Sequence, residues 1–586
     1  MPTQRFAHRF ISSACIALLA LLLIATPALA AFTPSNGQAA TLVLGQPNFT
    51  SHDNHTNQKG MFFPTSVAVD PATHKVFVVD YGNSRVLRFA SVYTLNNGAP
   101  AEAVLGQPNF TSIATNTTQN QMSSPTSVFV DSGGRLWVAD LQNNRVLRFD
   151  HAATLPNGAN ANGVLGQANF TSNITNGTKR YRMCAPSGVF VDAGGRLWVT
   201  DAGNNRVLRF DNAASKANGA NADGVLGQTS FIGDSEATSQ NGMFGPSALA
   251  VDASGRLWVA DEINARVLRF DSAASKANGA NADGVLGQPD FISNSFFTTQ
   301  AGMFNPNGVT VDNATGRLYV SDHSNNRILV FNVAAGLANG ADASFVLGQK
   351  DFTTGSPNTS GVSSSGLNQP DGVFYDQADK VLWAVDTQNH RVLMYSNPIT
   401  ALSSTSTAAN DGWMLESAAG SGKGGSLSAT GTLRVGDDAS NRQYRSILSF
   451  NTSALPDTAV IRSVTLKIKK AGAAGTDPLA SNVLSSLLAD IKKGSFAASA
   501  LELGDFQAIA SASAVGHFSS IGAGWYQLVL PASDFPCVNL TGGTQFRLRF
   551  GPASNYNHVA DYANFYAGDA TSTADRPVLI VQYRVP

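Results

Sequence analysis

Three polar residue types recur at a fixed spacing that could support chemistry. The pattern Asp-x-x-Asn-x-Arg occurs six times, at Asp80/Asn83/Arg85, Asp140/Asn143/Arg145, Asp201/Asn204/Arg206, Asp261/Asn264/Arg266, Asp322/Asn325/Arg327 and Asp386/Asn389/Arg391. A carboxylate beside an amide and a guanidinium could bind a polar ligand or move a proton. Six copies favour a structural role, because an active site needs one special constellation. We expect the Asp to accept backbone N–H groups of the following turn, the Asn to take the left-handed conformation, and the Arg to pair with a carboxylate in the same or an adjacent repeat.

The elements around this pattern repeat with the same period. Val-Leu-Gly-Gln recurs every 60 or 61 residues, with its glycine at Gly45, Gly106, Gly166, Gly227, Gly287 and Gly348. Each repeat has four short runs rich in Val, Leu, Phe and Trp, separated by Gly, Asp or Asn. In the third repeat they are residues 187–192, 195–201, 205–210 and 224–228. Four short strands per repeat predict a β-propeller blade.

The ends of the repeat array predict how the ring closes. The chain opens with a lone fourth-strand motif at residues 42–49, and the last repeat lacks its own Val-Leu-Gly-Gln. If the N-terminal strand completes the last blade, six whole blades form and no edge strand is left exposed. Trp137, Trp198, Trp258 and Trp383 share one strand position, where we expect rings buried between blades.

This region, about residues 40–397, resembles the NHL-repeat β-propellers. The matching stretch in the third repeat is Pro186-Ser-Gly-Val-Phe-Val-Asp192 through Asn205-Arg-Val-Leu-Arg-Phe210. Some propellers of this type resemble amidating lyases, whose zinc-binding His lies four residues after the blade Asp. Only His390 stands at that offset here, and His323 follows Asp322 directly. One His cannot supply the three protein ligands of a catalytic zinc, so we expect no enzyme and no catalytic metal.

The period stops near residue 397, and the Ser/Thr-rich residues 398–410 are predicted to be a linker. Residues 411–586 alternate as strands do and favour a jelly-roll-like β-sandwich, which makes the whole chain all-β. Residues 483–493 fit either a short helix or a poorly paired strand. The region resembles the DNRLRE-type sandwiches, grouped with carbohydrate-binding modules, through Leu433-Arg-Val-Gly-Asp437, Tyr444-Arg-Ser-Ile-Leu-Ser-Phe450 and Arg576-Pro-Val-Leu-Ile-Val-Gln-Tyr583.

A sugar site would combine an exposed aromatic ring with carboxylates or amides. Trp413, Tyr556, His558 and Asp561 are the candidate ligand-binding residues. Asp437 and Asp438 could hold a structural calcium, although a solvated acidic turn explains them as well. Together with His390, they are the candidate metal ligands.

Composition and the N-terminus bound the setting. The net charge is −1, charged residues are 13% of the chain, and no basic stripe indicates nucleic-acid binding. Arg5, His8 and Arg9, an apolar run over about residues 11–25, and Ala28-Leu29-Ala30 predict a signal peptide over residues 1–30. No later segment is expected to span a membrane.

These observations predict a secreted or cell-surface binding and adhesion protein without enzymatic activity. Its propeller would be a recognition scaffold, and its C-terminal domain would bind carbohydrate. The partners would be a polysaccharide or an extracellular protein. One alternative is an extracellular protein-interaction scaffold without sugar binding. A second is a metal-dependent propeller lyase.

Overall fold

The described residues form β-strands joined by turns and 3₁₀ helices of three to six residues, as the short apolar runs and frequent turn residues predict. The computed structural model describes residues 32–175, 178–334, 337–359, 361–397, 399–480, 486–552 and 554–584. The predicted signal peptide lies outside the described residues. Within these ranges no helix has the length and apolar character needed to cross a bilayer.

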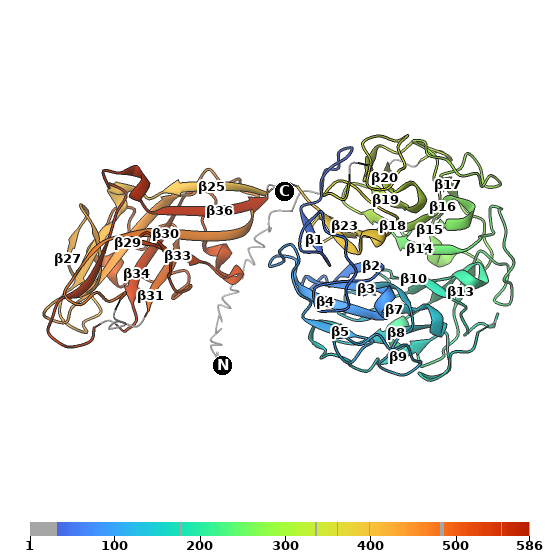
Figure 1. Ribbon diagram of the computed structural model, residues 1–586, viewed down its shortest axis with the longest axis horizontal. Coiled ribbons are helices and arrows are strands. Elements are labelled where there is room, and N and C mark those ends of the chain that lie inside the picture. Colours follow the sequence, from blue (N-terminus) through green and yellow to red (C-terminus); the bar gives the residue numbers. More distant parts are fainter. Residues whose placement is uncertain are drawn as a thin grey trace, which may run out of the picture.

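Residues 42–395 form six four-stranded antiparallel sheets arranged around a common centre, a six-bladed propeller (Figure 1). The innermost strands are β2 (Pro64–Val69), β6 (Pro125–Val130), β10 (Pro186–Val191), β14 (Pro246–Val251), β18 (Pro306–Asp312) and β22 (Pro370–Asp376). The second strands are β3 (Lys75–Asp80), β7 (Leu136–Asp140), β11 (Leu197–Asp201), β15 (Leu257–Asp261), β19 (Arg317–Asp322) and β23 (Val381–Asp386). The third strands are β4 (Arg85–Ser91), β8 (Arg145–Phe149), β12 (Arg206–Phe210), β16 (Arg266–Phe270), β20 (Arg327–Asn332) and β24 (Arg391–Tyr395). The outer strands are β5 (Ala103–Leu105), β9 (Gly163–Leu165), β13 (Gly224–Leu226), β17 (Gly284–Leu286), β21 (Phe345–Leu347) and β1 (Leu42–Leu44).

The N-terminal strand closes the ring, as predicted. β1 pairs antiparallel with β24, with Leu42 opposite Met394 and Leu44 opposite Val392. The sixth blade is therefore built from both ends of the repeat region, and its sheet order is β1-β24-β23-β22.

Short 3₁₀ turns connect the second and third strands of every blade. They are η1 (Tyr81–Asn83), η2 (Leu141–Asn143), η4 (Ala202–Asn204), η6 (Glu262–Asn264), η8 (His323–Asn325) and η9 (Thr387–Asn389). Three further turns, η3 (Ala152–Thr154), η5 (Ala213–Ser215) and η7 (Ala273–Ser275), follow third strands. We call the side of the propeller that carries the first set the loop face.

The propeller core lies between the blades. The four predicted inter-blade tryptophans are at most 2% exposed. Three of them, Trp137, Trp198 and Trp258, donate from Nε1 to Asp131, Asp192 and Asp252 at 2.9, 2.9 and 3.2 Å. Each of these three indoles has an acceptor for its N–H while its ring packs against the neighbouring blade, as expected of a buried Trp.

The C-terminal part is one connected system of twelve strands. They are β25 (Ile399–Thr405), β26 (Gly412–Glu416), β27 (Gly424–Ser428), β28 (Leu433–Asp437), β29 (Gln443–Asn451), β30 (Val460–Ala474), β31 (Leu487–Lys493), β32 (Ser519–Gly522), β33 (Trp525–Val529), β34 (Gly543–Phe550), β35 (Asp561–Phe565) and β36 (Val578–Arg584). The 3₁₀ turns here are η10 (Ala408–Asn410), η11 (Leu503–Phe506), η12 (Ala532–Cys537) and η13 (Thr573–Asp575). The long strand β30 pairs with β36 and β33 in its first part and with β35 in its last. Leu448, Leu466, Phe546 and Leu579 from different strands share one core. The jelly-roll connectivity remains a prediction.

One local prediction for this region is wrong, and one open choice is resolved. Residues 398–410 are not a linker, because β25 pairs with β36 over seven residues, from Ile399 opposite Arg584 to Thr405 opposite Val578. Ser and Thr are accepted there because one strand edge has no partner strand and its polar side chains reach water. The open choice over residues 483–493 resolves as a strand, since β31 pairs with β34 along its whole length; residues 481–485 lie outside the described ranges.

One polar cluster joins the two parts of the chain. The Arg462 guanidinium of β30 lies 5.1 Å from the centre of the Tyr93 ring. Tyr93 packs on His74, with ring centroids 4.7 Å apart, and His74 Nδ1 lies 2.9 Å from Asp379 Oδ2. Cys184 in the propeller and Cys537 in the C-terminal part are not joined by a disulfide.

Candidate functional site

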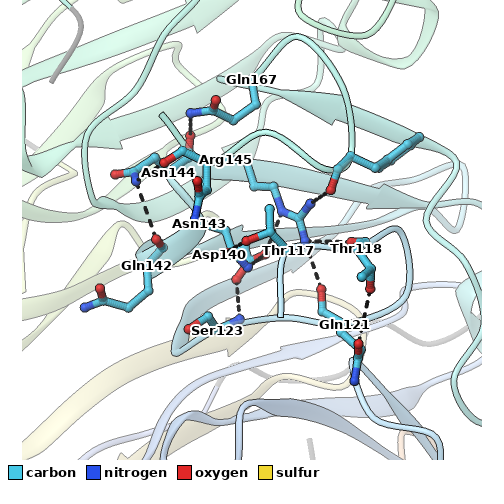
Figure 2. Close-up of polar contacts among 12 residues, drawn as sticks. Thr117, Thr118, Gln121, Ser123, Asp140, Gln142, Asn143, Asn144, Arg145 and Gln167 are labelled. Atoms are coloured by element: carbon cyan, nitrogen blue, oxygen red, sulfur yellow. Dashed lines mark hydrogen bonds and ion pairs between the residues drawn. The ribbon is translucent and has the colours of Figure 1, made fainter. Parts of the chain in front are cut away.

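The repeated Asp, Asn and Arg side chains form a closed hydrogen-bond network in each blade. In the second blade, Asp140 Oδ2 accepts from Arg145 Nε at 2.7 Å and from Asn143 Nδ2 at 2.9 Å (Figure 2). Its Oδ1 accepts from the backbone N–H of Ser123 at 2.7 Å. Both carboxylate oxygens therefore accept hydrogen bonds within the protein, as a buried carboxylate requires.

Two details of this network differ from the sequence prediction. The N–H that Asp140 accepts belongs to Ser123, which precedes the inner strand, and not to the turn that follows the Asp. The left-handed residue is Asn144, with φ of +54°, one position after Asn143. Asn143 instead uses its amide as a connector, because its Oδ1 accepts from Thr117 Oγ1 at 2.6 Å.

The guanidinium of Arg145 ties its blade to the loops. It donates from NH2 to the carbonyl oxygens of Thr118 and Gln121 at 2.8 and 2.9 Å, and from NH1 to that of Phe170. The pairing is with the Asp of the same blade. All six Arg and all six Asp are fully buried, which leaves them unavailable to a ligand: Asp80, Arg85, Asp140, Arg145, Asp201, Arg206, Asp261, Arg266, Asp322, Arg327, Asp386 and Arg391.

Residues that escape the repeat define a different surface at the centre of the loop face. The residue directly after each blade Asp differs in every blade: Tyr81, Leu141, Ala202, Glu262, His323 and Thr387. The residue after the first Pro of each inner strand also varies: Thr65, Thr126, Ser187, Ser247, Asn307 and Asp371. The sequence prediction missed this set, because it compared what the repeats share. The signal lay in the positions where they do not agree.

Eleven of these twelve variable residues, all but Ala202, line a central cavity of about 510 Å³. A second cavity of about 310 Å³ opens on the opposite side. Phe129, Phe190 and Phe374 line both cavities and so form the floor between them, with the first two rings 4.5 Å apart. The larger volume lies within the range of small-molecule sites.

The cavity wall is polar on one side. His323 Nδ1 lies 2.7 Å from Asp371 Oδ1, and Asn307 Nδ2 donates to the same oxygen at 3.0 Å. Burial lowers the pKa of His323, but the hydrogen bond and charge of Asp371 outweigh it and raise the pKa overall. Burial raises the pKa of Glu262 in the neighbouring blade, whose Oε1 lies 3.5 Å from Asn305 Nδ2.

His390, the candidate zinc ligand, takes a packing role in the described structure. Its Nδ1 accepts from the backbone N–H of Phe63 at 3.2 Å, and its ring meets that of Phe63 edge-on at 4.7 Å. Burial lowers the pKa of His390, which keeps the ring neutral as this acceptor role needs. In the described ranges, no three His, Cys, Asp or Glu side chains group as metal ligands.

Three of the four candidate sugar residues, Tyr556, His558 and Asp561, lie in or directly after one loop of the C-terminal part. Tyr556 is 67% exposed and His558 is also exposed. Asp561 is fully buried beneath them, and its Oδ2 accepts from the amides of Asn555 and Asn557 at 2.9 and 2.8 Å. Asp561 therefore anchors the loop that presents Tyr556. His558 is held by Asn441, whose Oδ1 accepts its backbone N–H at 3.0 Å.

The remaining candidates lie at other positions of the same sheet. Asp437 is buried opposite Asp561 in the β28–β35 register, and burial raises its pKa. Asp438 closes a turn by pairing with Arg442 at 2.6 Å. Trp413 lies away from the loop, and Arg434 covers its ring at 4.8 Å.

Comparison with known proteins agrees with the blade geometry. The NHL repeat model matches residues 183–210 and 305–331, which contain the first three strands of the third and fifth blades. The chain carries NHL repeats. Human NHL repeat-containing protein 2 is 24% identical over 360 residues, which is 57% of this chain and 46% of that protein. The match thus spans less than half of this relative's length.

Three solved structures resemble this chain at lower sequence identity. A streptogramin B lyase is 12% identical with a TM-score of 0.34, over 59% of this chain and 95% of the lyase. A protein of unknown function from Bacteroides thetaiotaomicron is 14% identical with a TM-score of 0.37, over 61% and 75%. An auxiliary nutrient binding protein from the same organism is 12% identical with a TM-score of 0.37, over 60% and 75%. TM-scores this low indicate nothing about activity.

Proposed function

We propose that this NHL-repeat protein is a secreted, non-enzymatic binding protein. Its propeller is the recognition scaffold, and its C-terminal part, a sandwich of the carbohydrate-binding type, engages polysaccharide. The observation that carries the binding role is the contrast between the two classes of polar residue. The repeated Asp, Asn and Arg side chains are buried and hydrogen-bonded within the blades, whereas the residues that vary between blades line the central cavity and the loops.

The loop face supports recognition by its exposed apolar side chains. Ile113, Ile174, Ile232 and Ile292 are 57, 49, 73 and 75% exposed, and Phe296 is 50% exposed. They lie in the loops that follow the outer strands. Apolar side chains held out on a rigid scaffold are typical of interaction surfaces. This feature favours a protein partner for the propeller as the second candidate function.

The carbohydrate role is supported by the exposed Tyr556 ring. A sugar ring stacks its C–H face on an aromatic ring, and neighbouring polar groups bind its hydroxyls. The loop fixed by Asp561 presents Tyr556 beside Asn557 and His558, which supply amide and imidazole groups.

A glycan-array screen of the mature protein tests this proposal. Binding that is lost in Tyr556→Ala and kept in Trp198→Phe, a change in the propeller interior, would support the carbohydrate role. The absence of binding to any glycan would refute it and leave the protein-interaction scaffold as the function.

A further inference from the structure

The wall of the central cavity is divided by charge. Its polar side comes from blades four to six and carries Glu262, His323 and Asp371. Its other side, from blades one and two, carries Phe63, Tyr81 and Leu141. Because the blades follow one another around a closed ring, these two groups face each other across the opening.

The polar side holds more acid than base. Two carboxylates and one imidazole line it, and the described lining residues include no Lys or Arg. Asp371 has His323 as its partner at 2.7 Å. Glu262 has an amide contact from Asn305 at 3.5 Å and no salt bridge among the described residues, and burial raises its pKa despite the charge of His323. A partly buried carboxylate in this position is stabilised by a cation from outside the protein.

The aromatic floor of the cavity determines what the uncharged part of a ligand must be. Phe129, Phe190 and Phe374 close the cavity below the charged groups, and small residues, Ala250 and Thr310, leave room between them. The rings offer apolar contact and negative π faces, both of which suit the body of an organic cation.

We propose that the central cavity of the loop face binds a small organic amine, with its ammonium group on Glu262 and Asp371 and its apolar body on the aromatic floor. This inference rests on the proposed role of the propeller as a binding scaffold and names the ligand class of that scaffold. It is independent of the carbohydrate role of the C-terminal part.

Calorimetric titration of the full mature chain with phenethylamine tests the proposal, with 2-phenylethanol as the neutral probe of the same shape. We expect saturable binding of the amine at millimolar concentration and at least about tenfold weaker binding of the alcohol, since only the amine carries a charge that pairs with the carboxylates. Glu262→Gln should weaken amine binding by a similar factor. Glu236→Gln removes the same charge from an exposed site outside the cavity and should leave binding unchanged.

Equal affinity for the amine and the alcohol, equal weakening by both variants, or no saturable amine binding would overturn the proposal. Should Glu262→Gln be recovered unfolded, Asp371→Asn carries the same expectation. Glycan binding through Tyr556 is expected to be unaffected in all these variants. Loss of glycan binding in the parent chain and loss of amine binding in the variants therefore report on separate proposals.

Discussion

Gln46 donates from Nε2 to the carbonyl oxygen of His390, 3.2 Å away, across the junction where the two ends of the repeat region meet. The same bond joins Gln107 to Ser84 and Gln167 to Asn144, each at 3.1 Å, within the other blades. The left-handed turn residue thus presents its carbonyl to the Gln that ends the outer strand. This bond gives Val-Leu-Gly-Gln a structural reason to recur, and the closing blade reproduces it.

Gly166→Ala should destabilise the propeller strongly. Gly166 has φ of +87°, and an added Cβ would lie 2.9 Å from the carbonyl oxygen of Asn144 and 2.8 Å from Met183 Sδ. The left-handed backbone and the steric contact act together, and we expect a loss of about 2–4 kcal/mol. Urea unfolding followed by tryptophan fluorescence measures it.

Gly134→Ala is the matched control for that change. Gly134 also has a positive φ, +70°, but nothing lies within 4 Å of its added Cβ. It should therefore lose only the backbone part, about 1 kcal/mol. Equal losses at the two positions would show that steric contact with the neighbouring turn does not explain the repeated glycine.

Arg145→Ala should act on stability rather than on binding. It leaves Asp140 buried without its partner, and breaking such a pair costs about 3–5 kcal/mol. Arg135→Ala breaks the pair with Asp131 at 2.9 Å, in which Arg135 is 33% exposed, and should cost about 1 kcal/mol or less. Thermal denaturation compares them. A loss of ligand binding in folded Arg145→Ala would contradict the structural role of the repeated residues.

The polar cluster that joins the two parts of the chain contains His74 and Asp379, and Asp376 interacts with Asp379. These groups should make the free energy of unfolding fall as pH rises from mildly acidic to neutral. Burial and the neighbouring Asp379 raise the pKa of Asp376 from 3.8 to about 7, so the folded protein binds a proton that the unfolded chain has released over this range. The hydrogen bond to Asp379 raises the pKa of His74, whose contribution is also present at low pH and lost as pH rises. Asp376→Asn should flatten the fall in unfolding midpoint. Asp342→Asn, at an exposed position, should leave it unchanged.

Asp561→Asn should weaken glycan binding through the loop rather than by direct contact. The amide keeps one oxygen, so it can accept either from Asn555 and Asn557 or from the backbone N–H of Thr476, but not from all three, and the segment that carries Tyr556 is held less firmly. We expect both lower affinity and a lower unfolding midpoint. Tyr556→Ala should lower affinity while stability changes by about 0.5 kcal/mol or less, since the ring is exposed. The opposite pattern would place the contact on Asp561.

The repeat period predicted the propeller well because every blade consists of the same strands packed in the same way. The strand Leu42–Leu44 could be placed because only the last blade lacked an outer strand. The linker prediction was wrong because the Ser/Thr composition of residues 399–405 hid a strand whose partner, β36, lies far along the chain. The cavity was missed for the opposite reason. Glu262, His323 and Asp371 are far apart in sequence and break the repeat, so only the ring brings them together.

The pairing of β1 with β24 also orders events during synthesis. The ribosome releases Leu42–Leu44 first, yet their partner Arg391–Tyr395 emerges some 350 residues later. At roughly 5–20 residues per second, the first strand waits for tens of seconds for its partner strand. In the meantime only the first blade can hold it, through the bonds of Val43 with Asn97 and Gly98 at 3.1 and 3.0 Å. The ring can therefore close only after Arg391–Tyr395 has emerged, and we expect a nascent propeller to become resistant to proteolysis at that point.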